Sequence, residues 1–318
     1  MRDGTQGVTM ARGRSRHALV APAVAAIVTA FLITGCGFGP GQDRGSAEVV
    51  ITRDYGRVLM YEGRQSVRES DDAMRLLARA TDSVETRYGG GFVESIDGYG
   101  SGADGDGSAT DWFFYLDGEE SPVGALDAEV EPGQTVWWDR RDWSAAMHVP
   151  AVVGSWPQPF ESTDEPVGLE CLRAPRRVCS QIQRDLEDVG AEVRRVRAGE
   201  DPGGLRILVG PWSQLRRDSL ASKIEAGPAE SGVYARFTSV GGRWLIQPLD
   251  RSADESGRPV RGGLVAALSR EPGEVTWIVT GTDEDSLPGS LVESVLERRY
   301  AVLYPTGNAG GAREVPSP

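Results

Sequence analysis

The sequence predicts an α+β protein in which a mixed sheet carrying one helix precedes an α/β domain with small helices. In residues 47–146, two strand-like segments come before one helical segment, and further strands follow it. In residues 165–306, strand-like and helical segments alternate. These orders are typical of a sheet packed on a single helix and of a sheet covered by several helices, respectively. Residues 147–164 are predicted to link the two regions.

The first region opens with two strands and a helix. The helix is expected in "SDDAMRLLARATDS", residues 70–83, where Ser70 can cap the amino end and apolar side chains recur on one face. An Asp-Gly pair at 117–118 and a Pro-Gly pair at 132–133 predict turns between later strands. The strands are expected at residues 47–54, 57–63, 84–88, 92–97, 112–116 and 135–140.

Strands and helices alternate in the second region. Its clearest helix is residues 175–190, where Val178 and Ile182 share one face and Gly190 marks the end. The other helices are expected at residues 213–227 and 283–299, and the strands at 168–174, 191–198, 205–210, 232–237, 243–250, 275–281 and 300–305. Residues 307–318 are rich in glycine, proline and polar residues, which predicts a disordered tail.

The amino terminus predicts export and a lipid anchor. Residues 18–34 are uncharged and follow three arginines, which is the order found in a secretion signal. The run ends in "ITGC", which resembles the lipobox of bacterial lipoproteins, so we expect residues 1–35 to be removed and Cys36 to carry the lipid. A retained membrane anchor is the alternative. Either way, we expect residues 36–46 to act as a polar tether and the rest to lie on the extracytoplasmic face of the cell membrane.

The charge of the chain argues against polyanionic partners. The formal net charge is −13, and residues 1–35 hold four arginines and one aspartate, so their removal makes the remainder more negative. An acidic surface repels phosphate backbones and anionic headgroups. We therefore expect no nucleic-acid partner, and contact with the membrane only through the lipid anchor.

Two cysteines remain once Cys36 is assigned to the lipid. Thiols in an oxidising compartment usually pair, so Cys171 and Cys179 are predicted to form a disulfide. Two separately buried thiols are the alternative. His148 is the only histidine after residue 35, which argues against a metal site.

No set of residues predicts catalysis. Ser231 has no histidine nearby in sequence, and His148 is the only imidazole available as a base. Acidic residues are abundant, but nothing marks a particular pair for glycoside hydrolysis. The sequence therefore predicts no catalytic residue and no cofactor, and an extracellular hydrolase is the most remote alternative.

Three motifs indicate a family for the first region. "YGGGFVESIDGYG" (88–100), "DWFFYLDGEESPVGA" (111–125) and "EPGQTVWWDRRDW" (131–143) resemble, in this order, the β-grasp domain that ends transcobalamin and intrinsic factor. The resemblance implies a soluble-ligand-binding β-grasp domain in which the glycine-bounded hairpin and the aromatic strand form one wall of a ligand site. The helical barrel that supplies most cobalamin contacts in those carriers has no counterpart here, so a cobalamin-like molecule is only one candidate ligand.

The aromatic strand presents rings on both faces. Trp112 and Phe114 lie on one face, and Phe113 and Tyr115 lie on the other, because side chains alternate along a strand. One set should face the helix, whereas the other needs a different cover: the following region, a small ligand, or a protein or glycan partner. The residues predicted to bind a ligand are Trp112, Phe113, Tyr115, Trp137 and Trp143.

These patterns lead to a functional hypothesis. We expect a lipid-anchored extracytoplasmic binding protein that captures a small, flat ligand, such as a corrinoid, and passes it to a membrane transporter. The alternative is a structural or interaction protein of the cell envelope that contacts protein or glycan.

Overall fold

The computed structural model is mostly β-sheet with few helices, in agreement with the predicted mixed class. It describes residues 42–103, 109–200, 203–271, 273–293, 297–306 and 311–317. Residues 40–318 group into one compact unit. Cys36 and the predicted signal lie outside the described residues. Within the described ranges, every helix is too short or too polar to cross a bilayer.

The first sheet has the strand order β2-β1-β9-β7-β6, with β8 pairing with β7. Its two central strands, β1 and β9, run parallel, and the flanking pairs are antiparallel. The sheet is therefore mixed, as predicted. The strands are β1 (Asp43–Arg53), β2 (Val58–Arg68), β6 (Gly102–Ala103), β7 (Ala109–Leu116), β8 (Glu119–Glu120) and β9 (Thr135–Asp142).

One helix covers a face of this sheet. Helix α1 (Ala73–Ala80) buries Leu76 and Leu77 against Ile51 and Trp138. The predicted cap was Ser70, but the Asp72 carboxylate accepts the hydrogen bond from the backbone NH of Arg75 at 2.8 Å. A small sheet completes this layer, formed by β3 (Val84–Arg87), β4 (Phe92–Ile96) and β5 (Tyr99–Gly100), with the short helix η1 (Tyr88–Gly90) between β3 and β4.

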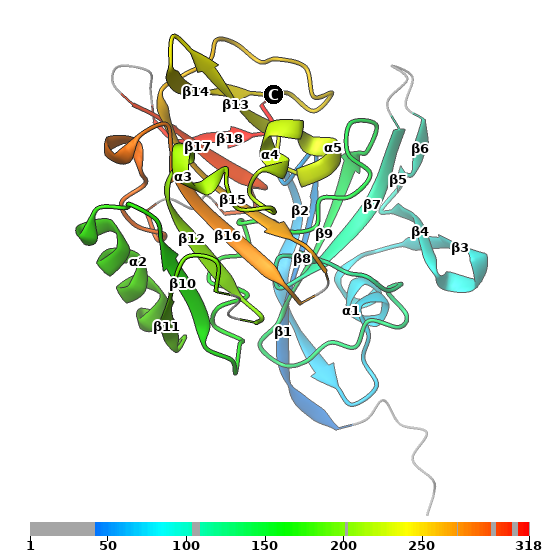
Figure 1. Cartoon of the computed structure of the whole chain (residues 1–318). Coiled ribbons are helices and arrows are strands. Elements are labelled where there is room, and N and C mark those ends of the chain that lie inside the picture. Colours follow the sequence, from blue (N-terminus) through cyan, green and yellow to red (C-terminus); the bar gives the residue numbers. More distant parts are fainter. Residues whose placement is uncertain are drawn as a thin grey trace, which may run out of the picture. The chain divides into compact units, whose positions relative to one another are not determined.

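The second large sheet has the order β11-β10-β12-β16-β15-β17-β18. The first four strands in this order are parallel, and the remaining pairs are antiparallel. The strands are β10 (Val167–Cys171), β11 (Val193–Val196), β12 (Arg206–Pro211), β15 (Gly262–Ser269), β16 (Val275–Gly281), β17 (Ala301–Pro305) and β18 (Arg313–Val315). Helix α2 (Arg176–Asp188) packs on one face, as Figure 1 shows.

The opposite face of the second sheet carries a hairpin and three short helices. The hairpin is β13 (Ala235–Val240) and β14 (Arg243–Pro248), and the helices are α3 (Trp212–Leu215), α4 (Lys223–Ala226) and α5 (Pro228–Ser231). A continuous helix over 213–227 was expected here, and this prediction was wrong. The helix is interrupted between α3 and α4, where the Asp218 side chain accepts hydrogen bonds from the backbone NH groups of Leu220 and Ala221 and so starts a new turn.

Two further expectations for the second region need correction. The predicted helix over 283–299 is reduced, among the described residues, to one short turn, η2 (Glu284–Ser286), because Pro288 and Gly289 interrupt the pattern. The predicted disordered tail contains β18, which pairs with β17. Arg57 further holds this strand through its contacts with Glu314 and the carbonyl oxygen of Pro316.

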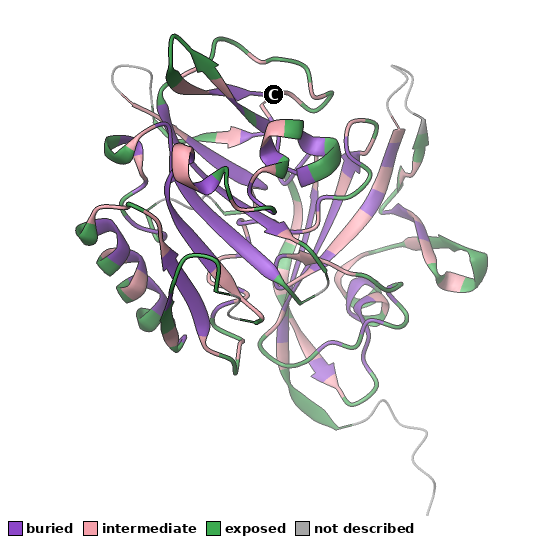
Figure 2. Cartoon of the chain, in the orientation of Figure 1, coloured by how far each residue is buried: buried purple, intermediate pink, exposed green. Residues whose placement is uncertain are grey.

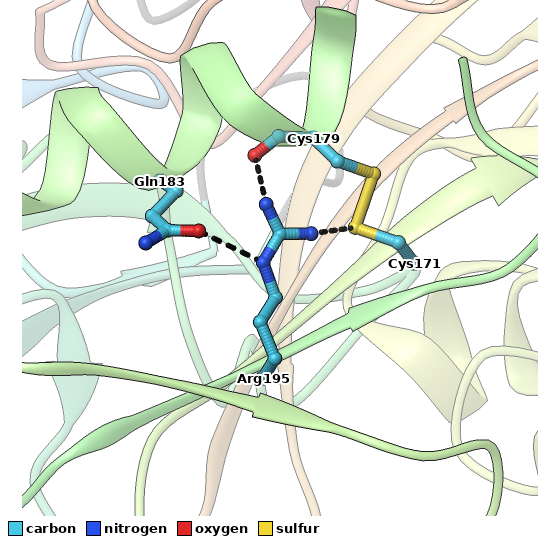
Figure 3. Close-up of a disulfide and its surroundings, with 4 residues drawn as sticks. All are labelled: Cys171, Cys179, Gln183 and Arg195. Atoms are coloured by element: carbon cyan, nitrogen blue, oxygen red, sulfur yellow. Dashed lines mark hydrogen bonds between the residues drawn. A yellow bond between two sulfur atoms is a disulfide. The ribbon is translucent and has the colours of Figure 1, made fainter. Parts of the chain in front are cut away.

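The predicted disulfide between Cys171 and Cys179 is present and joins the end of β10 to the first turns of α2 (Figure 3). Arg195 of β11 lies across it. Its guanidinium donates to the Cys171 Sγ and to the Cys179 carbonyl oxygen, each at 2.9 Å, and to the Gln183 side chain. The bridge and this arginine therefore connect β10, α2 and β11.

We predict that replacing both Cys171 and Cys179 with alanine lowers the free energy of unfolding by about 2–3 kcal/mol. Without the cross-link, the unfolded chain is no longer closed into a loop and gains conformational entropy. Urea denaturation of the variant and of the reduced wild-type protein measures the effect. Relative to the oxidised wild type, the variant and the reduced protein should show similar decreases in the free energy of unfolding. A reduced protein as stable as the oxidised one would contradict the prediction.

Candidate functional site

The first face of the aromatic strand β7 belongs to the core beneath α1. Trp112 is 6 % exposed, and its Nε1 donates to the Tyr99 carbonyl oxygen at 2.9 Å. Phe114 stacks on Trp138 with 4.7 Å between ring centroids. These rings pack with α1 and β4, so Trp112 offers no open face to a ligand.

The second face of the strand packs against the second sheet. Tyr115 and Trp137 are 0 % and 1 % exposed and contact Tyr300, which precedes β17. Leu264 and Leu303 of the second sheet belong to the same cluster. The cover for this face is therefore the chain itself, one of the three alternatives that the sequence left open. The expectation that Tyr115 and Trp137 contact a ligand is corrected, because the second sheet occupies the space beside them.

A buried carboxylate lies at the centre of this contact. Asp139 is 0 % exposed and accepts hydrogen bonds from Thr52 at 2.6 Å, Gly56 NH at 3.2 Å and Tyr300 OH at 2.9 Å. Tyr115 OH in turn donates to Tyr300 OH at 3.2 Å. Burial raises the pKa of Asp139, Tyr115 and Tyr300. These groups join the two sheets, and their burial gives no route to a substrate.

A buried guanidinium lies two residues along β9. Arg141 has a fully buried side chain and donates to the carbonyl oxygens of Ala146 at 2.8 Å and Met147 at 2.9 Å. Its guanidinium lies 3.7 Å from the centroid of the Phe113 ring. One face of Phe113 is therefore occupied by a cation from the same chain.

The five predicted ligand-binding residues thus lie in different environments. Trp112, Tyr115 and Trp137 are buried, whereas Phe113 and Trp143 are half-buried. The backbone NH of Trp143 donates to the carbonyl oxygen of Ala109, which ties the end of β9 to the start of β7. The structure does not gather the five rings around one hollow.

Of three hollows in the described part of the chain, only the smallest is lined by one of these five rings, Trp137. One, of 660 Å³, is lined by Leu303, Arg313 and Glu314 beside the C-terminal strand. A slot of 100 Å³ lies between Trp137 and Trp156, and this volume is about that of three waters. A groove of 570 Å³ crosses β10 and β12. The slot is too small for a corrinoid.

An exposed apolar surface lies at the β3–β4 hairpin and the adjacent loop. We call Tyr88, Phe92, Val123 and Leu126 the hairpin surface. Tyr88 is 86 % exposed, Val123 47 % and Leu126 44 %, and Figure 2 shows the exposed turn between β3 and β4. Tyr88 and Phe92 are 6.4 Å apart between centroids. A Cβ built at Gly90 would lie 3.0 Å from the Leu126 Cδ1, so the loop packs closely on the turn.

The sequence carried a signal for this surface. The "YGGGF" segment was predicted to form part of a ligand-site wall, but its rings were not chosen as site residues. Gly89 and Gly90 have φ values of 73° and 97°, which glycine adopts without strain. This turn projects Tyr88 away from the core.

Comparison with known proteins finds a family match for one segment of the chain. Residues 71–141 match a family described as a domain of unknown function (DUF4430), and this segment contains all or most of each of the three motifs. No curated protein matches the chain. The chain is similar to a solved structure of haptocorrin in complex with Cbi, at 16% identity and a TM-score of 0.26, over 31% of this chain and 25% of that one. The chain thus spans a quarter of the haptocorrin chain.

We predict that Tyr300→Phe lowers the free energy of unfolding by about 1–3 kcal/mol, because the buried Asp139 loses a donor and Tyr115 loses an acceptor. Chemical denaturation measures the change. Tyr88→Phe, at an exposed ring, is the matched control and should change stability by less than about 0.5 kcal/mol. Equal effects of the two substitutions would contradict the assigned role of Tyr300.

We further predict a pH dependence that Asp139→Asn removes. Burial raises the pKa of Asp139 from its ordinary value of 3.8, so the native state keeps a proton that the unfolded chain has lost. The free energy of unfolding of the wild type, relative to that of the variant, should therefore fall as pH rises from about 4 through the raised pKa. Denaturation of both proteins from pH 4 to 8 tests this, and a difference that stays constant or rises would refute it.

Proposed function

We propose that this chain is an extracytoplasmic binding protein, lipid-anchored through Cys36, that docks its hairpin surface on another protein at the membrane. It performs no chemistry of its own in this proposal. The observation that carries it is the 86 % exposure of Tyr88 beside Phe92, Val123 and Leu126, in a structure that buries most of its other large rings.

The form of the hairpin surface favours a protein over a small molecule. Small-molecule sites are concave and enclose most of the ligand. None of the three hollows described above is lined by Tyr88, Phe92, Val123 or Leu126. Tyrosine and phenylalanine are enriched in protein interfaces, where a few aromatic anchors dominate the binding free energy. An exposed turn that presents an aromatic ring suits such a contact.

The tether supports a partner in or near the membrane. Strand β1 begins at Asp43, earlier than the predicted 47, so only residues 37–42 separate it from Cys36. At no more than about 3.6 Å per residue, six residues reach roughly 20 Å. With Cys36 acylated, the first sheet would therefore stay close to the bilayer surface. A membrane transporter is a partner of this kind.

A second candidate function is the capture of a small, flat ligand such as a corrinoid. It is supported by Phe113 and Trp143, the two predicted ligand-binding rings that remain half-buried. Corrinoid added to the full-length protein would then quench tryptophan fluorescence, and Trp143→Phe would reduce the quenching. Docking through Tyr88 predicts no such effect.

The docking proposal predicts where cross-links form. A photo-reactive benzoylphenylalanine in place of Tyr88 or Leu126 should cross-link the full-length protein, in its own membranes, to a protein of constant mass. The same residue in place of Val240, which is 56 % exposed on β13, is the matched control and should not yield that product. Mass spectrometry identifies the product. The proposal fails if neither position 88 nor position 126 gives an adduct, or if position 240 gives the same adduct.

A further inference from the structure

The groove of 570 Å³ lies on the second sheet, on the side opposite α2. Its wall includes Glu170 and Arg206, from the neighbouring strands β10 and β12. Arg206 shares its face of β12 with Leu208, whereas the alternate residues Ile207 and Val209 pack in the cluster that contains α2. The groove volume falls within the range of small-molecule sites.

In the floor of the groove, two acids share one arginine. Arg206 bonds the Glu170 carboxylate with one Nη atom and the Asp218 carboxylate, at 2.9 Å, with the other. The backbone NH of Gly199 also donates to Glu170. Burial opposes ionisation of Asp218, but bonds from the Ala221 NH and Arg206 outweigh it and hold the pKa of Asp218 below its usual range. Both acids are therefore occupied by partners from the chain.

The third acid of the groove is also paired. The Glu200 carboxylate accepts from Arg194 at 3.0 Å and from the Arg197 NH at 3.2 Å. Two cations then remain without a counter-charge. Arg217 and Arg270 line the groove with exposed residues, and neither guanidinium forms a hydrogen bond or ion pair with another residue in the described part of the chain. The three acids and three arginines of the lining sum to zero, so the positive charge is confined to these two side chains, on a chain whose formal net charge is −13.

We propose that this groove binds a small organic anion, with a carboxylate or phosphate group held by Arg217 and Arg270. Guanidinium groups form their strongest hydrogen bonds with such oxyanions. Gln214 and Ser219 supply further polar side chains for hydroxyl or carbonyl groups, and Leu172 supplies apolar contact. A hydroxylated carboxylic acid or a sugar phosphate has this combination of groups. The site is separate from the hairpin surface and does not depend on the proposed function.

Equilibrium dialysis of the full-length protein against labelled citrate and, separately, labelled inorganic phosphate tests the proposal at 0.15 M salt. We expect at least one of the two to bind with a dissociation constant below about 1 mM. The double variant Arg217→Gln/Arg270→Gln should weaken that binding at least tenfold. Comparison of the two probes shows whether the site prefers carboxylate or phosphate.

The matched control is Arg243→Gln/Arg258→Gln, which removes the same charge from two exposed arginines outside the groove. It should leave the dissociation constant within twofold of the wild-type value. The proposal fails if neither probe binds, if the groove variant still binds like the wild type, or if the control weakens binding as much as the groove variant does. Circular dichroism of both variants checks that the fold is retained.

Discussion

The two large sheets are held together by the burial of Tyr115 and Trp137 against Tyr300. Neighbouring ring centroids lie 5.6–5.8 Å apart, a separation at which aromatic rings attract each other. Each ring removes roughly 150–250 Å² from water, worth about 4–6 kcal/mol at ~25 cal/mol per Å². Separation of the sheets would return this area to solvent. The relative placement of the first and second sheets therefore depends on these rings.

Apolar burial alone would permit several placements of one sheet on the other, and the buried polar groups select among them. Asp139 has all three of its donors only when Tyr300 lies beside β9. Arg141 likewise reaches the carbonyl oxygens of Ala146 and Met147 only when the chain turns back after β9. An ionised group left buried without partners costs several kcal/mol. A shifted placement would remove the Tyr300 donor from Asp139, so this bond favours one placement of the sheets, whereas the bonds of Arg141 fix the loop after β9.

Sequence reasoning identified most strands, the α2 helix and the disulfide, because each depends on residues close together in the chain. It could not decide what covers the second face of β7. The alternation of side chains along the strand assigns Tyr115 to the second face, but its partner Tyr300 lies 185 positions away in the chain. A ligand that covered this face would be compatible with the same alternation. It also missed β15, "GGLVAALS", because glycine and alanine give little strand signal, although this strand lies inside the second sheet. The hairpin surface could not be predicted, because a ring in a turn has no alternation pattern that assigns it to the core or to solvent.

The burial of these rings changes which ligands the chain can bind. For a flat molecule to stack on Trp137, it would have to displace Tyr300, which contacts that ring and also donates to Asp139. Such a ligand would need to replace both the ring contact and a hydrogen bond to a buried carboxylate. Recognition is therefore left to groups that the core does not use. Tyr88 of the hairpin surface and the two exposed arginines of the groove, Arg217 and Arg270, meet this condition, because their removal would leave the buried contacts intact.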